Sequence, residues 1–291
     1  MKVAYLKVLV DTRGGELGTV DSSQVTERKV RMDACETPDA GGKMSAATPV
    51  RVGVLGAGTV GGHVIHLLDQ WADEYERRLG VRLDVESVLV RRLEAKRAFP
   101  IASELLSTDP YAVIDGKDIV VELIGGVEPA FDYVMAALRK GTAVVTGNKA
   151  LIASRGPELF EAARQANTRL YFEAAVAGAI PVIRALSGSL RGDRVRQIAG
   201  VVNGTTNFIL DAMTTRGADY NEALTQAQEL GFAEADPSAD VEGYDASAKC
   251  AIMSSLSFGR WVSVDSVPRQ GITALSTDDI AFAAEQGCVV K

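Results

Sequence analysis

A glycine-rich turn between a short apolar strand and a helix is the feature that most constrains the fold of this chain. Residues 51–55 read RVGVL, residues 56–61 read GAGTVG, and residues 62–79 carry apolar side chains along one side. In such a turn the first glycine permits a tight bend, the second lets the backbone approach a pyrophosphate, and the third lets helix and strand pack closely. The helix N-terminus adds free N–H groups for phosphate oxygens. We predict cofactor contacts at Gly56, Ala57, Gly58, Thr59, Val60 and Gly61. A glycine-rich turn without a ligand is the weaker alternative.

Strands and helices alternate through the first part of the chain. The sequence predicts strands at residues 51–55, 83–90, 118–124, 143–146 and 170–174, and helices at 62–79, 129–139 and 157–167. This alternation is typical of a parallel sheet with right-handed crossovers. We therefore predict an α/β fold, a Rossmann-like doubly wound parallel sheet over residues 49–178. Residues 1–48 have no sustained period, and we expect this arm to be poorly ordered apart from a short strand within residues 1–10.

The pattern changes after residue 178, and we place a domain boundary at 178–181. The sequence predicts helical segments at residues 181–186, 205–215, 221–230 and 245–258, a strand at 194–202, and an acidic loop at 232–243. We interpret residues 179–291 as an α+β substrate and dimerisation domain.

Charge and composition exclude several classes of function. The net charge of -7 and the pI of about 5.1 argue against nucleic-acid binding, which needs a basic surface. The apolar runs are too short to cross a membrane. Cys35, Cys250 and Cys288 form no C-x-x-C pair, and we interpret Cys250 as a small core residue. We expect a cytoplasmic enzyme without a disulfide framework. The two histidines, His63 and His66, give neither a zinc site nor a catalytic base.

The end of the second predicted strand bears on the choice of cofactor. Folds that prefer NAD place an acid there to bind the ribose 2′-hydroxyl, whereas an arginine accommodates a 2′-phosphate. Here the strand ends in Val90, Arg91 and Arg92. We therefore favour NADP(H), with NAD(H) as the second option. The alternative is that both arginines lie in solvent.

A lysine follows a run of acids near the end of the chain. Residues 231–249 read GFAEADPSADVEGYDASAK, and Asp245 and Lys249 share one face if a helix begins at Asp245. Reduction of an aldehyde by hydride makes an alkoxide, and a positioned lysine can donate the proton that it needs. The alternative is a solvated ion pair worth about 0.2–0.5 kcal/mol. Lys149, in the turn TGNKA after another strand, is either a cofactor or substrate contact or a surface residue.

These segments together resemble the homoserine dehydrogenase family. The matching segments are VGVLGAGTVG (52–61), VVELIGG (120–126), TGNKALIA (146–153), FEAAVAGAIPVI (172–183), GVVNGTTNFIL (200–210) and GFAEADPSADVEGYDASAK (231–249). They keep their order across about 200 residues. The resemblance implies NAD(P)-dependent interconversion of L-homoserine and L-aspartate 4-semialdehyde, a step towards threonine and methionine, by a homodimer.

The resemblance also implies roles for individual residues. Lys249 is the expected proton donor and acceptor, with Asp245 beside it. The expected substrate contacts are Glu234, Asp240, Asp245 and Lys149, with Lys149 also reaching the cofactor. The expected sodium ligands, mainly through backbone carbonyls, are Glu173, Val176, Gly178 and Ile180.

Two departures from the family pattern leave alternatives open. The arm of nearly fifty residues is not part of the pattern, and the family continues past residue 291, often with a regulatory ACT domain. We therefore expect the substrate domain to be incomplete, and the alternative function is a truncated, inactive NADP-binding module. A remoter alternative is an aspartate-semialdehyde dehydrogenase that forms an acyl-enzyme through Cys250.

The arginines after the second strand give a direct prediction. With homoserine as the second substrate, kcat/KM measured with the NADP couple should exceed that measured with the NAD couple, because Arg91 and Arg92 meet the 2′-phosphate. Initial rates followed at 340 nm for both cofactors check this. A clear preference for NAD(H) contradicts the expectation.

Overall fold

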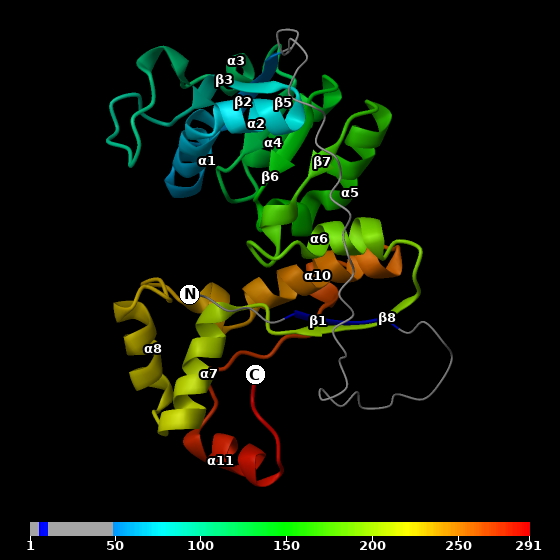
Figure 1. Ribbon diagram of the computed structural model, residues 1–291. Coiled ribbons are helices and arrows are strands. Elements are labelled where there is room, and N and C mark those ends of the chain that lie inside the picture. Colours follow the sequence, from blue (N-terminus) through cyan, green and yellow to red (C-terminus); the bar gives the residue numbers. More distant parts are fainter. Residues whose placement is uncertain (1–5, 11–48) are drawn as a thin grey trace.

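The computed structural model describes residues 6–10 and 49–291, which form two parts joined through helix α10 (Figure 1). Strand β1 (Leu6–Val10) agrees with the short strand expected near the start of the chain. The rest of the expectation for residues 1–48 lies outside the described residues. Among the helices of the described ranges, none has both the length and the apolar character needed to cross a membrane.

A six-stranded parallel sheet forms the core of the first part. Its strands are β2 (Pro49–Leu55), β3 (Arg82–Leu89), β4 (Leu106–Ser107), β5 (Ile119–Glu122), β6 (Ala143–Thr146) and β7 (Leu170–Tyr171). Their order is β4-β3-β2-β5-β6-β7, and every pair is parallel. The order in which strands are added to the sheet reverses between β2 and β5, and in such sheets ligands bind outside the carboxyl ends of the strands at that point. The predicted Rossmann-like sheet is confirmed.

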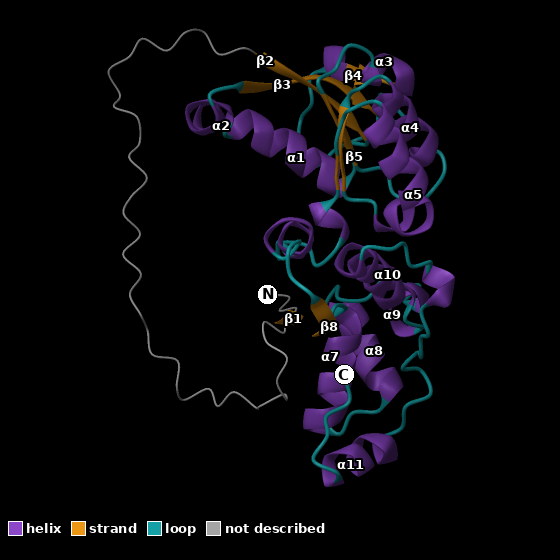
Figure 2. Cartoon of the chain, turned by 90° about the vertical axis from the view of Figure 1, so that its right-hand side faces the viewer, coloured by secondary structure: helices purple, strands orange, loops and turns teal. Residues whose placement is uncertain are grey.

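Helices cover both faces of this sheet (Figure 2). One face carries α1 (Thr59–Gln70) and α2 (Ala72–Leu79), and the other carries α3 (Pro110–Ile114), α4 (Ala130–Arg139) and α5 (Lys149–Gln165). Each face has its own apolar core. Ile65 packs with Val54 and Val88 on the α1 side, whereas Leu138 and Leu151 belong to the core on the other side. Each such side chain stabilises the fold by about 1.5–3 kcal/mol through burial.

Several element boundaries differ from the sequence predictions. The helix predicted at residues 62–79 is two helices that meet at Trp71. The helix predicted from residue 157 begins at Lys149, because the Oδ1 atom of Asn148 accepts a hydrogen bond from Leu151 N at 3.1 Å and caps the helix there. Pro157 lies inside this helix rather than in its first turn. The last strand ends at Tyr171, and the chain continues as the 3₁₀ turn η3 (Glu173–Ala175).

The second part is mainly helical. After α6 (Val182–Arg184) and a π-helical turn, η4 (Ala185–Ser189), strand β8 (Val195–Gly200) pairs with β1 in an antiparallel two-stranded sheet. The helices that follow are α7 (Gly204–Arg216), α8 (Tyr220–Glu229), α9 (Ser238–Val241), α10 (Tyr244–Phe258) and α11 (Thr277–Glu285). Helix α9 lies inside the predicted acidic loop, and the sequence analysis did not predict α11. The short elements η2 (Ser103–Leu105) and η5 (Val264–Ser266) complete the described chain.

Helices α5 and α10 hold the two parts together. The ring of Trp261, just beyond α10, packs against Gly156 of α5, where an added Cβ would collide with the indole. Trp261 also contacts the ring of Phe160, one turn further along α5. These contacts fix α5 against the second part, so that the first residue of α5, Lys149, reaches α10.

Candidate active site

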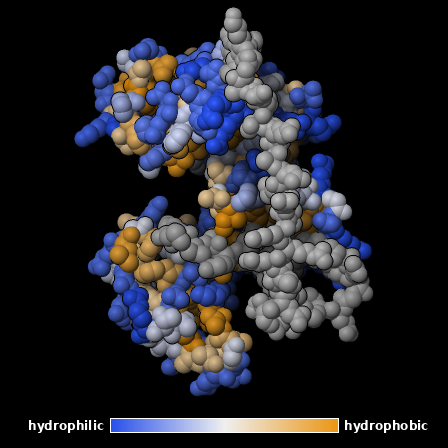
Figure 3. Space-filling view, in the orientation of Figure 1, coloured by the Kyte–Doolittle hydropathy of each residue, from blue (hydrophilic) through white to orange (hydrophobic). Residues whose placement is uncertain are grey.

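The glycine turn leaves open space where a phosphate group would bind. The backbone at Gly56 has a φ of 105°, and a Cβ on Gly61 would collide with the carbonyl oxygen of Gly56. These two glycines are therefore required by the protein itself. A Cβ on Gly58, in contrast, meets no described atom within 4 Å. Gly58 precedes α1 without a side-chain cap, so the first N–H groups of the helix face this space. The turn fits a pyrophosphate, and the protein surface is hollowed between the sheet and the part that contains α7 and α8 (Figure 3).

A buried glutamate joins the ends of β5 and β6. Glu122 is fully buried, and its carboxylate accepts hydrogen bonds from Thr146 Oγ1 at 2.5 Å and Ile124 N at 2.8 Å. Asn148 Nδ2 donates to Glu122 Oε1 at 3.4 Å and to Gly126 O at 2.6 Å. A carboxylate only accepts hydrogen bonds, so it can bring these donors together. The network positions the start of α5. The sequence analysis missed this role, although an acid inside an apolar strand was a signal for it.

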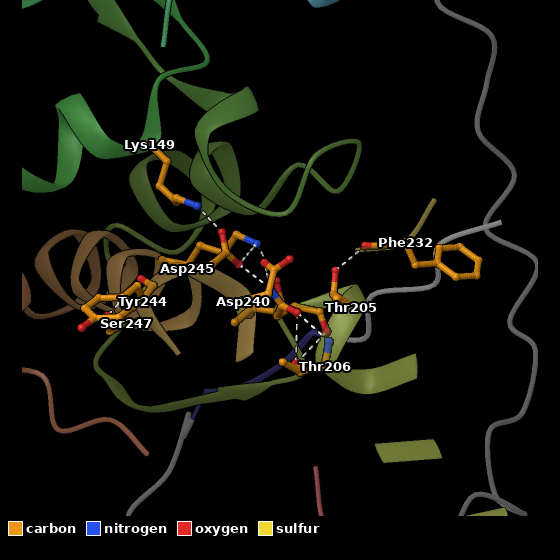
Figure 4. Close-up of polar contacts among 11 residues, drawn as sticks. Lys149, Thr205, Thr206, Phe232, Asp240, Tyr244, Asp245 and Ser247 are labelled. Atoms are coloured by element: carbon orange, nitrogen blue, oxygen red, sulfur yellow. Dashed lines mark hydrogen bonds and ion pairs between the residues drawn. The ribbon is translucent and has the colours of Figure 1, made fainter. Parts of the chain in front are cut away.

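Lys149 and Lys249 meet at one carboxylate, that of Asp245, and Figure 4 shows Lys149 pointing towards it. Lys149 Nζ, at the start of α5, donates to Asp245 Oδ1, and Lys249 Nζ, one turn further along α10, donates to Oδ2 at 2.6 Å. Asp245 is only 8% exposed. The helix begins at Tyr244, so Asp245 and Lys249 share a face as the spacing predicted. The side chains of Lys149 and Lys249 remain 28% and 16% exposed, so neither side chain is completely buried.

The loop between β8 and α7 completes this cluster. The Nδ2 atom of Asn203 donates to Asp240 Oδ1 at 2.6 Å and to Asp245 Oδ2 at 2.9 Å. Val202 O accepts from Lys249 Nζ at 2.7 Å. Two of the three N–H donors of Lys249 are thus used by Asp245 and Val202. The sequence analysis did not single out Asn203, although an asparagine just before a predicted helix is a capping signal.

Asp245 carries a negative charge at neutral pH. Burial raises the pKa of Asp245, but hydrogen bonds from Lys149, Lys249 and Asn203 outweigh burial, and the pKa lies below its ordinary value of 3.8. The cluster holds two ammonium groups and two carboxylates, those of Asp240 and Asp245. Its formal charges therefore balance before any substrate binds.

Other predicted site residues lie outside these contacts. Glu234 is exposed, and only its carbonyl oxygen has a recorded partner among the described residues, Gln228 Nε2 at 3.1 Å. Arg91 and Arg92 are exposed directly after β3, and Arg92 O accepts from Arg97 Nη2 at 2.7 Å. Both arginines are therefore at the strand end that the sequence indicated.

The predicted cation ligands lie in one turn after β7. Glu173 accepts hydrogen bonds from Ile183 N at 2.9 Å and Arg184 N at 2.8 Å, so its carboxylate is already bound to the start of α6. Ala177 and Gly178 both have a positive φ, of 61° and 57°. A residue other than glycine in that region is strained unless its surroundings hold it. Across residues 49–291 the structure forms no group of three His, Cys, Asp or Glu side chains that could bind a metal ion. A cation in this turn would depend mainly on carbonyl oxygens.

The cysteine and the two histidines complete the comparison with the sequence. Cys250 is exposed, with its Sγ atom 3.9 Å from Ser254 Oγ, so the prediction of a core position was wrong. The prediction failed because Cys250 lies on the solvent side of α10, whereas Ala248 and Ala251 of the same helix face the core. His63 is exposed and His66 half-buried, and both rings pack against Phe99.

Two family models divide the chain where the fold divides. The model described as the NAD binding domain of homoserine dehydrogenase matches residues 56–173, and the model described as homoserine dehydrogenase matches residues 181–291. The chain belongs to the homoserine dehydrogenase family. It is 50% identical over 245 residues to the homoserine dehydrogenase of Mycobacterium tuberculosis, covering 84% of this chain and 55% of that protein. The chain thus spans about half the length of the curated relatives it matches.

Solved structures of the family agree with this fold. A homoserine dehydrogenase from Thiobacillus denitrificans is 44% identical with a TM-score of 0.79, covering 84% of this chain and 57% of that one. A hyperthermophilic archaeal homoserine dehydrogenase in complex with NADPH is 31% identical with a TM-score of 0.67, covering 79% of this chain and 76% of that one.

Two glycine substitutions separate the folding role of the turn from its binding role. Gly61→Ala should lower the free energy of unfolding by about 1–3 kcal/mol, because the new methyl group has no space. Gly58→Ala should leave stability unchanged and weaken NADPH binding at least tenfold, because only a ligand would meet its methyl group. Thermal unfolding and titration of NADPH fluorescence measure the two effects. Unweakened NADPH binding by Gly58→Ala would show that no phosphate binds there.

The lowered pKa of Asp245 predicts a loss of stability in acid. A carboxylate whose pKa is lower in the folded state stabilises the protein above the unfolded value, and this contribution disappears as the pH falls below about 4. Asp245→Asn should cost about 1–3 kcal/mol near pH 7, because buried donors lose their partner. It should cost less at pH 3. Urea unfolding of both proteins at the two pH values checks this, and an equal cost at both contradicts it.

Proposed function

We propose that this protein is an NADP(H)-dependent homoserine dehydrogenase that interconverts L-homoserine and L-aspartate 4-semialdehyde. The observation that carries the proposal is the meeting of Lys149, Asp245 and Lys249 at the carboxyl end of the sheet. Strand β6, which leads to Lys149, lies two strands from β2, which leads to the glycine turn. Neighbouring strands are about 4.8 Å apart, so the two sites are separated by roughly 10 Å across the sheet. A dinucleotide is long enough to extend over this distance.

Lys249 is the group that we assign to proton transfer. The bound nicotinamide supplies or accepts the hydride. In the direction of reduction, the Lys249 ammonium donates a proton to the aldehyde oxygen as the alkoxide forms, and the neutral amine then regains a proton from water. Asp245 and Val202 O hold two of the three N–H groups of Lys249, which leaves one for the reacting oxygen. In the direction of oxidation, the neutral amine accepts the proton of the alcohol.

The acids around this lysine suit the ammonium group of the amino-acid substrate. Asp240 is half-buried, and one of its oxygens binds Asn203 while the other has no partner recorded in the described residues. We assign Asp240 to the substrate ammonium, with Glu234 as a second acid from the exposed loop. We assign Lys149 to both the substrate and the nicotinamide end of the cofactor, supported by its position at the start of the helix that follows β6.

The preference for NADP(H) rests on Arg91 and Arg92 at the end of β3. The family carries an NAD binding domain, and one archaeal relative was solved with NADPH. Arginine at this strand end is compatible with the additional phosphate, and the side chains of Arg91 and Arg92 are both exposed.

Two further assignments complete the proposal. We assign a sodium ion to the turn that contains Glu173, Val176, Gly178 and Ile180, supported by its positive-φ backbone and its carbonyl donors. We also infer a homodimer. It is supported by β8, in which Gln197, Ala199 and Gly200 are exposed and could face a second copy. Sedimentation velocity of the purified protein tests the dimer.

The role assigned to Lys249 predicts the effect of its removal. Lys249→Met should lower kcat for homoserine oxidation by about 10²–10⁴-fold, the usual contribution of a positioned acid or base. Affinity for NADPH should remain within about threefold. The matched control is Lys140→Met, which removes an exposed lysine whose ion-pair partner within the described residues is Asp115. Initial rates and NADPH titration give both values.

Two outcomes would contradict the proposal in different ways. Unchanged kcat in Lys249→Met would remove the assignment of the proton donor but keep the reaction. Tight NADPH binding by the unaltered protein without any homoserine oxidation would instead favour a cofactor-binding module without turnover.

A further inference from the structure

Asn203 occupies a position that the reaction scheme above leaves without a role. It lies between β8 and α7 and is only 7% exposed. Its Oδ1 atom caps α7, accepting hydrogen bonds from Thr206 N at 2.8 Å and Thr206 Oγ1 at 3.0 Å. Because Oδ1 faces donors, the amide orientation is fixed and Nδ2 must face the opposite way.

On that opposite side the amide nitrogen separates two carboxylates. Asp240 Oδ1 is 2.6 Å from Nδ2 and Asp245 Oδ2 is 2.9 Å from it. The two acids come from different helices, α9 and α10. Two oxygens bound to one nitrogen at these distances lie at most about 5.5 Å apart, a separation at which like charges repel and resist ionisation together. The amide supplies one N–H to each.

We propose that Asn203 is a positioning residue of the active site, whose amide holds the carboxylates of Asp240 and Asp245 in place, one for the substrate ammonium and one for Lys249. This inference rests on the proposed function. The loop before α7 binds Lys249 through Val202 O and binds both acids through Asn203. One backbone segment therefore sets the position of all three side chains.

One substitution removes the spacing and keeps the cap. In Asn203→Asp the oxygen that accepts from Thr206 N remains, and aspartate caps helices as well as asparagine does. An oxygen replaces the amide nitrogen, so that a third carboxylate faces those of Asp240 and Asp245. The ammonium groups of Lys149 and Lys249 lie beyond Asp245. The matched control is Asn221→Asp, the same chemical change at an exposed position in α8.

The kinetic expectation differs from that of a merely structural residue. Asn203→Asp should raise KM for homoserine about 10- to 100-fold, the range for losing a hydrogen bond to a charged group. The acidic limb of kcat/KM against pH should move upward by about 1 pH unit, because a third carboxylate raises the pKa values of its neighbours. KM for NADP⁺ should stay within about twofold. The Asn221→Asp control should match the unaltered protein in all three.

A measurement without turnover separates this inference from the proposed function. We expect the Tm of Asn203→Asp, relative to that of the unaltered protein, to decrease as the pH is raised from 4 to 8. The folded state resists ionisation of the third carboxylate and therefore loses stability as the pH rises. If this fall occurs while the unaltered protein oxidises no homoserine, the proposed function fails and the spacing role stands. If the Tm difference is independent of pH and KM is unchanged, the spacing role is overturned.

A second variant covers the case in which Asn203→Asp does not fold. Asn203→Ser keeps an oxygen for Thr206 N and removes the amide without adding charge. We expect a raised KM for homoserine with no shift of the acidic limb. An unchanged KM in Asn203→Ser overturns the inference.

Discussion

The carboxylate of Asp245 is the contact on which the candidate site depends. It accepts hydrogen bonds from Lys149, Lys249 and Asn203, which come from α5, from α10 itself and from the loop before α7. An ionised carboxylate that is 8% exposed needs such donors, because burial alone would favour its neutral form. One of these bonds, from Lys149, links the sheet domain to the helical part. The hydrogen bonds to Asp245 therefore keep this carboxylate ionised, orient Lys149 and Lys249, and connect the two parts of the protein.

The two parts contribute different chemistry to the cleft. The sheet domain contributes mainly backbone groups. These are the free N–H groups of α1 and the loops at the ends of β5 and β6, which Glu122 connects by hydrogen bonds. The helical part contributes charged side chains on α9 and α10. This arrangement is consistent with a reaction in which the cofactor carries the hydride and the protein moves only a proton. Lys149 is the residue that links the two contributions.

Hydrophobic period and turn chemistry were enough to predict the sheet. The run at residues 118–124 indicated a buried strand of a parallel sheet, and the structure has that sheet. The start of α5 was missed because a proline suggested a first turn at Pro157, whereas Asn148 caps the helix eight residues earlier. Local sequence patterns therefore predicted the existence of helices and strands better than their first and last residues.

The spacing of residues along the sequence could not predict contacts between distant segments. The i,i+4 relation of Asp245 and Lys249 follows from one helix, but Lys149 meets Asp245 across 96 residues, and only the family resemblance placed them together. Asn203 is separated from Asp240 by 37 residues and from Asp245 by 42. Such contacts depend on how α5, α7 and α10 pack, and no period in the chain encodes that packing.

The two lysine contacts of Asp245 differ in what maintains them. Lys249 and Asp245 are on one rigid helix, so their pair persists in any arrangement of the two halves. Lys149 belongs to α5, and its bond exists only while the halves are together. Separation of the two halves would thus remove one counter-ion from Asp245 and keep the other. Because Lys149 and Asp245 are both partly accessible, raised ionic strength would weaken the contact between the halves more than the contact within the helix.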